Sequence, residues 1–345
     1  MNRFRYVVLV LFLIASSLAI AQSTPKTVVA VSGDGIHRIL KKNGLDPVKY
    51  YKAFIALNKK RLGPKNGLFI GTKYVLPEKE ANENAANNRT TTAEKPGPKT
   101  INEPLFGEKY ASITMEDESL SGAIYYLISG HGGPDPGALI SKDKKLVSED
   151  EYAYDVNLRL ARRLMSKGAT VYIIVRDPND GIRDQRLLPI DYDEVNYPNK
   201  RIPRSQRLRL RQRTESVNAL FRKHGKAYQR LIVTHVDSRS VGEKIDVFFY
   251  HHKNSKKGKS MANALQNTFK KKYARYQPNR KYAGTVASRS GLYVIRNTLP
   301  AMVYIELGNL KNTKDQKRIL DYNNRDALAK WIFEGLVDDF SQQKN

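Results

Sequence analysis

Three residues that can bind a metal or transfer a proton each follow an apolar run of the chain. His131 lies in a glycine-rich turn, while His235 and Glu306 end two later runs. Each run predicts a buried strand, and ligands of α/β sheets bind at the carboxyl ends of the strands. We therefore expect the three side chains to meet in one crevice. The runs cover residues 123–128, 231–234 and 301–305.

The chemistry that these residue types allow is that of a catalytic metal site. Zinc accepts neutral imidazoles and carboxylates as ligands, and a catalytic zinc keeps one position for water. A single histidine at a strand end is more often structural or exposed. A pair of them, one inside a Gly-His-Gly-Gly turn, favours metal binding by His131 and His235.

Strands and helices must alternate around these residues to position them. From about residue 108 onward the apolar patterns do alternate in this way, which predicts an α/β fold around one sheet. Residues 151–165 carry a helical stripe that ends before Gly168, a helix stop. Further helices are expected at 205–224, at 260–273 and from about 325, and further strands at 171–175 and 245–250.

The segment 130–138, Gly-His-Gly-Gly-Pro-Asp-Pro-Gly-Ala, resembles the opening motif of the zinc-dependent N-acetylmuramoyl-L-alanine amidases. The segments 291–296 and 300–312 resemble later motifs of the same family. The resemblance covers residues 122–338 and implies a single mixed sheet flanked by helices. It also implies hydrolysis of the amide that joins N-acetylmuramic acid to L-alanine of the peptidoglycan stem peptide.

The resemblance assigns roles to particular side chains. It implies that His131, His235 and a glutamate at the start of the following helix bind Zn²⁺. Glu306 would be the general base, taking a proton from zinc-bound water and passing it to the leaving nitrogen. Four residues in the family's expected order would bind substrate: Arg176, Arg213, Asn218 and Arg296.

The third metal ligand can be placed in more than one register. The family motif reads Glu-Lys-Asp-Val-x-Leu, and aligning its Asp-Val pair with residues 155–156 puts Ala153 at the ligand position. Aligning the apolar positions instead puts Glu149 there, which keeps both a carboxylate and the apolar face of the helix. Glu149 is favoured, with Glu151 as the alternative. Either carboxylate would also complement the helix dipole.

The first 21 residues have the pattern of a signal peptide. A basic start, a short apolar run and an Ala-x-Ala motif predict cleavage after Ala21. The alternative is a membrane anchor, for which the apolar run is short. The sequence has no cysteine, so it offers no site for lipid attachment or disulfides. We expect an exported protein, periplasmic or associated with the cell wall, without an integral membrane segment after cleavage.

Residues 25–78 predict a small strand–helix–helix–strand unit. A Gly33-Asp34 turn, in which Asp34 is expected to cap the first helix, a Leu-Asn pair at Asn58 and a Gly-x-x-Tyr-x-Leu-Pro ending resemble the LysM module. The resemblance implies binding of N-acetylglucosamine-containing glycans, with Gly33, Asp34 and Asn58 as candidate contacts. The alternative is a packing appendage without a ligand.

Residues 79–107 predict a flexible linker, because they are rich in Asn, Ala, Thr, Pro and Lys and show no apolar period. The catalytic domain would then cover 108–345. The formal net charge of +26 suits solubility or anionic envelope polymers. Export and the lack of a nucleic-acid motif argue against nucleic acid. The expected partners are peptidoglycan and a protein activator or regulator.

Two features leave alternatives open. Residues 177–204 form a longer connection than the family usually has, so they are either a lid or regulatory element or a surface excursion. The sequence around Glu149 also departs from the family motif Glu-Lys-Asp-Val-x-Leu. This departure allows a second hypothesis, a non-catalytic envelope-binding protein that keeps the fold. A zinc peptidase acting on the stem peptide is a third hypothesis, although the sequence has no His-Glu-x-x-His motif.

Overall fold

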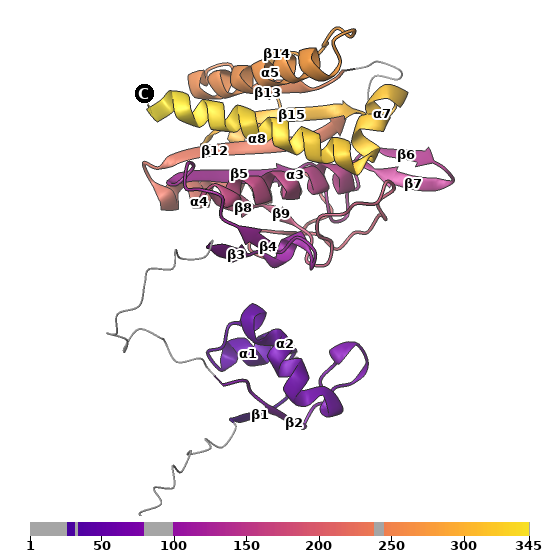
Figure 1. The fold of residues 1–345 in the computed structure, drawn as a ribbon, viewed down its shortest axis with the longest axis vertical. Helices are drawn as coiled ribbons and strands as arrows, with labels where there is room; N and C mark the ends of the chain where they lie inside the picture. The colour runs from indigo at the N-terminus through magenta and orange to yellow at the C-terminus, as the bar shows by residue number, and fades with distance from the viewer. Residues whose placement is uncertain (1–25, 32–33, 79–98, 238–244, 345) are drawn as a thin grey trace, which may run out of the picture. The chain divides into compact units, whose positions relative to one another are not determined.

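The computed structural model describes residues 26–31, 34–78, 99–237 and 245–344, which belong to two compact units, Met1–Ala93 and Glu94–Asn345 (Figure 1). The expected signal peptide, Gly33 and most of the expected linker lie outside the described residues. In these described ranges no helix is both long and apolar enough to cross a membrane.

The N-terminal unit has the strand–helix–helix–strand order that its sequence predicts. Strands β1 (Thr27–Val29) and β2 (Lys73–Val75) pair antiparallel, and helices α1 (Ile36–Lys42) and α2 (Pro47–Asn58) lie between them in the chain. Two short 3-10 turns, Lys59–Arg61 and Pro64–Asn66, connect α2 to β2. The unit has its own small core, which includes Ile36, Ile39, Leu40, Leu45, Tyr50, Phe54, Tyr74 and Leu76.

Two polar residues of this unit serve its own structure. The side-chain amide of Asn58 donates to the carbonyl of Val75 and accepts from its N–H, both at 2.8 Å, and Asn58 is 1% exposed. Asn58 therefore locks α2 to β2, and the expectation that it contacts a glycan is wrong. Asp34 does not cap α1, which begins after Gly35 without a side-chain cap. Its carboxylate accepts from the N–H of Val31 and pairs with Lys42 instead.

The second unit is built on a six-stranded sheet of order β14-β13-β15-β12-β5-β8. Four neighbouring strands run parallel, whereas β13 runs antiparallel to β15 and parallel to β14. The predicted mixed sheet is thus confirmed. Its strands are β5 (Ala123–Ser129), β8 (Thr170–Ile173), β12 (Tyr228–Asp237), β13 (Phe248–His251), β14 (Val286–Ser288) and β15 (Ala301–Asn309).

Helices cover both faces of this sheet (Figure 1). Strand residues alternate between two apolar clusters, so that Tyr125 and Leu127 face one side and Tyr126 and Ile128 the other. Four helices belong to the first side: α3 (Glu149–Ser166), α5 (Lys256–Tyr276), α7 (Thr313–Leu320) and α8 (Tyr322–Lys344). The second side holds α4 (Gln206–His224) and α6 (Tyr293–Asn297).

Part of the expected linker belongs to this unit. Strand β3 (Thr100–Asn102) pairs with β4 (Ser112–Thr114), and the side chain of Phe106 in the turn Pro104–Phe106 is fully buried in the core. The second unit therefore extends on the N-terminal side of residue 108 and includes Thr100. Phe106 and the partly buried Ile101 and Leu105 attach this stretch to the core of the sheet domain.

The long connection 177–204 is folded onto the domain. It follows β9 (Val175–Arg176) and contributes β10 (Val195–Asn196) and β11 (Lys200–Arg201) to a small antiparallel sheet. Leu188 is buried in the core, and its N–H donates to the Tyr152 hydroxyl of α3. A hairpin that the sequence analysis did not predict, β6 (Leu139–Lys142) and β7 (Lys145–Ser148), precedes α3.

Candidate metal centre

The turn after β5 holds His131 in an uncommon backbone conformation. His131 has φ 64°, and Gly132 and Gly133 that follow also have positive φ. A side chain at Gly130 would overlap the ring of His235, and one at Gly137 would lie 2.7 Å from the His131 ring. The glycines of this turn are therefore needed because the two imidazoles occupy the space beside them.

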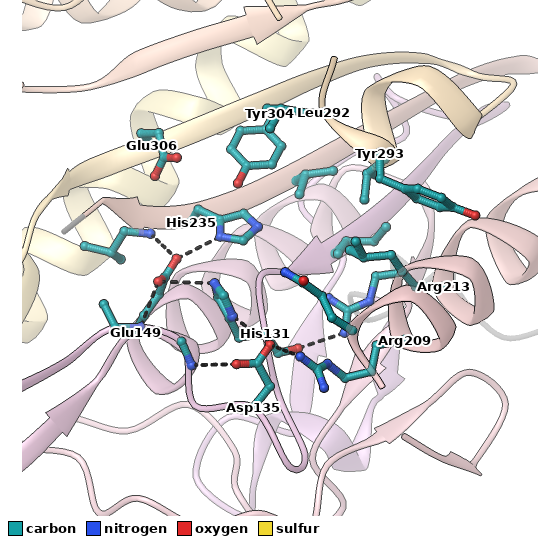
Figure 2. Close-up of a pocket in the computed structure, with 18 residues that line it drawn as sticks. His131, Asp135, Glu149, Arg209, Arg213, His235, Leu292, Tyr293, Tyr304 and Glu306 are labelled. Atoms are coloured by element: carbon teal, nitrogen blue, oxygen red, sulfur yellow. Dashed lines mark hydrogen bonds and ion pairs between the residues drawn. The ribbon is translucent and has the colours of Figure 1, made fainter. Parts of the chain in front are cut away.

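The structure brings His131, Glu149 and His235 together (Figure 2). The Nε2 atom of His131 lies 3.2 Å from one carboxylate oxygen of Glu149, and the Nδ1 atom of His235 lies 2.7 Å from the other. One potential ligand atom from each residue falls within 4.8 Å of the others. Glu149 begins α3 and is 5% exposed, so the first turn of this helix carries it to the histidines.

The other two residues considered as the third ligand, Glu151 and Ala153, do not face the histidines. Glu151 pairs with Arg183 at 2.7 Å and accepts a hydrogen bond from the N–H of Asp191. Ala153 is fully buried and has no donor atom to offer. Among the three, Glu149 is the residue whose side chain faces both histidines.

The electrostatics of this group favour a cation. Burial alone would raise the pKa of Glu149, but hydrogen bonds with the two histidines hold it well below its usual range. Burial opposes protonation of His131, yet Asp135 and Glu149 raise its pKa to about 10. Burial lowers the pKa of His235 below its ordinary value, which favours the uncharged imidazole. A buried anionic carboxylate between two imidazoles is stabilised by any positive charge placed among them.

Asp135 orients His131, a role that the sequence analysis did not assign. Its carboxylate lies 3.0 Å from Nδ1 of His131, on the side of the ring away from Glu149, and 2.5 Å from the guanidinium of Arg209. A carboxylate behind a histidine fixes the tautomer and direction of the ring. Asp135 follows His131 by four residues within the same glycine-rich turn, and this closeness in sequence could have indicated the contact. Arg209 is itself buried, although it belongs to the arginine-rich helix α4.

A cavity of about 520 Å³ opens beside these residues. Glu306 lines it, is 3% exposed, and stands opposite His235 in the register of β15 and β12. The Tyr304 ring stacks on His235 with 4.6 Å between centroids. Arg213 also lines the cavity and donates to the backbone carbonyl of His131 at 3.0 Å (Figure 2).

Three of the four residues expected to bind substrate do not line this cavity. The guanidinium of Arg176 donates to backbone carbonyls and stacks on Tyr197, so it supports the small sheet. The amide of Asn218 bonds to the backbone at residues 297 and 299. Arg296 lines a separate hollow at the opposite ends of β12 and β15. For these three the contacts give no support to substrate binding at this cavity, and the expectation stays a prediction.

The donor set fits a catalytic zinc site. Two imidazoles and one carboxylate form a three-residue set of the kind that leaves a position for water, and no sulfur donor is needed. The residues 177–204 contribute no lining to the cavity, so they do not cover it as a lid. The described arrangement is a buried carboxylate, Glu306, lining the same cavity as a metal-compatible triad.

Comparison with known proteins decides the family. The model of the N-acetylmuramoyl-L-alanine amidase family, Amidase_3, matches residues 126–338. The chain belongs to this family. It is accordingly a peptidoglycan hydrolase of the amidase type, and the matched segment of this amidase contains all three members of the triad.

Relatives of this amidase are distant in sequence. The germination-specific N-acetylmuramoyl-L-alanine amidase of Bacillus subtilis (strain 168) is 25% identical over 225 residues, which cover 65% of this chain and 82% of that protein. The CwlD amidase of Clostridioides difficile, solved in complex with the GerS lipoprotein, is 21% identical with a TM-score of 0.46, covering 64% of this chain and 98% of that one. The catalytic domain of CwlV from Bacillus (Paenibacillus) polymyxa var. colistinus is 18% identical with a TM-score of 0.45, at the same coverage.

Proposed function

We propose that this chain cleaves the amide between N-acetylmuramic acid and L-alanine in a zinc-dependent reaction. The observation that carries the proposal is the convergence of His131, Glu149 and His235 beside a cavity lined by Glu306. These three residues would hold the zinc. The metal would lower the pKa of a bound water and polarise the amide carbonyl.

Glu306 would act as the general base and then as the general acid. Its carboxylate would take a proton from the attacking water and deliver it to the alanine nitrogen as the C–N bond breaks. The products would be a free lactyl carboxylate and a stem peptide with a new amino terminus. Its position in the carboxyl-terminal half of β15, opposite His235 in β12, supports this role.

Arg213 would hold a negatively polarised oxygen of the substrate. It lines the cavity, and its Nε atom has no hydrogen-bond partner among the described residues. Burial lowers its pKa to about 10, with the charge of Arg209 adding to the effect. A guanidinium stays charged at that pKa at neutral pH and is therefore available to a carbonyl or carboxylate oxygen.

The parts outside the catalytic domain would bring it to the polymer. We propose that residues 25–78 are a LysM-like module that binds glycan, supported by the order β1-α1-α2-β2 and the antiparallel pairing of the two strands. A tether to the polymer raises the effective concentration of nearby bonds. Export by a signal peptide in residues 1–21 completes the proposal.

Identification of the cleavage products tests the reaction. Purified peptidoglycan is digested with the wild-type protein, with His235→Ala and with Asp143→Asn, an exposed carboxylate outside the cavity, as the matched control. We expect intact stem peptides that begin with free L-alanine from the wild type and from Asp143→Asn, and none from His235→Ala. Peptides cut inside the stem would mean a peptidase. A zinc-loaded wild type without products would contradict the proposal.

A further inference from the structure

A second group of carboxylates lies in the long connection between β9 and β10. One carboxylate oxygen each from Asp177, Asp191 and Asp193 falls within 4.8 Å of the other two. Asp191 also forms a similar set with Glu151 and Glu194. None of the residues in the first set belongs to the triad around Glu149, and none lines its cavity.

Two oxygens in this group are buried without a hydrogen-bond partner. Asp177 is 1% exposed; its Oδ1 accepts from the N–H groups of Asn179 and Asp180, while its Oδ2 has no partner among the described residues. The Oδ1 atom of Asp191 is likewise buried and unpartnered there. Leaving a charged oxygen buried and unpaired costs several kcal/mol, so such atoms indicate a missing partner.

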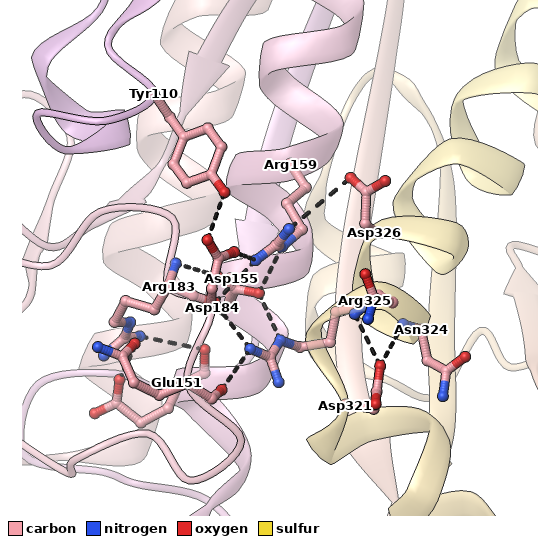
Figure 3. Close-up of polar contacts among 12 residues, drawn as sticks. Tyr110, Glu151, Asp155, Arg159, Arg183, Asp184, Asp321, Asn324, Arg325 and Asp326 are labelled. Atoms are coloured by element: carbon pink, nitrogen blue, oxygen red, sulfur yellow. Dashed lines mark hydrogen bonds and ion pairs between the residues drawn. The ribbon is translucent and has the colours of Figure 1, made fainter.

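The positive charge nearby is already engaged. Arg183 pairs with Glu151 at 2.7 Å and with Asp180, as the contacts to Glu151 show in Figure 3. Among the described residues no ion pair involves Asp177, Asp191 or Asp193. Burial raises the pKa of Asp177 to about 6, and it also raises the pKa of Asp191, with Asp193 and Asp180 contributing. The group is therefore short of positive charge.

We propose that Asp177, Asp191 and Asp193 bind a divalent cation of the Ca²⁺ class. Carboxylate and carbonyl oxygens with added waters are the ligands that Ca²⁺ takes, usually six to eight of them in flexible geometry. The set has no imidazole or sulfur donor, which separates it from the zinc triad. Asp193 is exposed, so an ion and its waters can enter from solvent.

A cation here would steady the turn that carries His131. Glu194 follows Asp193 directly, and its carboxylate accepts a hydrogen bond from the N–H of Gly133 at 2.6 Å. Ile202, from the same connection, lies 3.0 Å from where a Cβ on Gly133 would be, so it packs against the turn. The cation would thus order the segment that supports the metal-binding turn from behind, without touching the substrate.

Terbium luminescence tests this site directly. Tb³⁺ replaces Ca²⁺ at oxygen sites and is sensitised by a nearby tyrosine, and Tyr192 lies between two of the ligands. Full-length protein loaded with one equivalent of zinc is titrated with Tb³⁺, and Ca²⁺ or Mg²⁺ is then added in competition. The variants are Asp193→Asn, which changes an exposed residue, and Asp177→Asn. The matched control is Glu118→Gln, whose side chain is 68% exposed and remote from the group.

We expect saturable sensitised emission that Ca²⁺ displaces with a Kd between about 10⁻⁵ and 10⁻³ M, more tightly than Mg²⁺. Asp193→Asn should weaken Ca²⁺ binding at least about tenfold, as should Asp177→Asn, whereas Glu118→Gln should leave it unchanged. Absence of saturable emission in the wild type, or equal binding in Asp193→Asn and Glu118→Gln, would overturn the proposal. Because no substrate is present, the result does not depend on whether the protein is an active amidase.

Discussion

Helix α3 contributes Asp155 to one buried group of charged residues and Glu149 to another, and the two groups differ in how completely their hydrogen bonds are satisfied. In the first, Asp155 accepts hydrogen bonds from Arg159, Arg325 and the N–H of Arg183 at 2.6 to 2.8 Å (Figure 3). Arg325 and Asp155 are both fully buried. The other guanidinium nitrogens of Arg325 donate to four backbone carbonyls. This group is closed and joins α3, α8 and the long connection.

The triad around Glu149 is organised in the opposite way. Asp135 contacts His131 and the N–H of Val236 donates to Glu149. The side chains of His131, Glu149 and His235 nevertheless all line a cavity (Figure 2). A closed group uses its charges to hold the fold, whereas an open one keeps its ligand atoms available. Burial of charge alone therefore does not identify a functional site; an open side does.

The largest effect should come from breaking the closed group. Arg325→Met removes one partner of a buried pair and leaves Asp155 partly uncompensated, so the free energy of unfolding should fall by about 3–5 kcal/mol. Urea unfolding measures it. The control Arg163→Met breaks a more exposed pair with Asp326 and should cost about 1 kcal/mol or less. An equal decrease in the free energy of unfolding in both variants would show that the closed group stabilises the fold no more than an exposed ion pair does.

Glu306→Gln should act on the reaction and not on the fold. Removing a general base reduces the rate by about 10²–10⁴-fold, while unfolding in urea should change little. The rate of stem-peptide release measures the first quantity, with Glu215→Gln, an exposed carboxylate, as the control. A variant that keeps more than a tenth of the activity would remove Glu306 from the proposed mechanism.

Asp135→Asn should loosen the metal while keeping its ligands. The amide cannot hold the His131 ring as the carboxylate does, and loss of such an outer partner costs about 10–100-fold in metal affinity. Competition with a zinc chelator measures it against Asp143→Asn. Unchanged affinity would mean that the turn alone orients His131.

The smallest effect is a pH dependence at the edge of the closed group. Burial would raise the pKa of Asp184, but hydrogen bonds from Lys109 and Tyr110 outweigh it and lower the pKa to about 2. Because the folded pKa is depressed, its stabilisation is complete above about pH 4 and is lost as the pH falls toward 2. Asp184→Asn should therefore destabilise most above pH 4 and little near pH 2, in urea unfolding at each pH. A difference independent of pH would contradict this.

Much of the fold could be predicted because strands and helices leave periodic marks. Strands β5, β12 and β15, and helices α3, α4, α5 and α8, lie where the apolar patterns predict them, within a few residues. Their convergence followed from the common edge of parallel strands. The antiparallel direction of β13 in the sheet could not be predicted, because the apolar pattern does not depend on strand direction. Phe106 was hidden in a polar stretch that composition alone assigns to a linker.

The details of the site depended on tertiary contacts that spacing does not encode. Asp135 meets Arg209 across 74 positions of the chain. The resemblance assigned Asn218 and Arg296 to substrate binding, but the Asn218 amide bonds to the backbone of Asn297 and Arg296 lines a separate hollow. The roles of Glu149 as a ligand and Glu306 as a base stay predictions, with geometry that supports them.

The metal content of the purified full-length protein tests the central claim most directly. Wild-type protein, His235→Ala and the control Asp143→Asn are purified identically, dialysed and analysed for metals. The account predicts about one zinc per chain in the wild type and in Asp143→Asn, and a loss of nearly all of it in His235→Ala. A wild type without stoichiometric zinc after loading, or full zinc retention in His235→Ala, would contradict a catalytic zinc held by His131, Glu149 and His235.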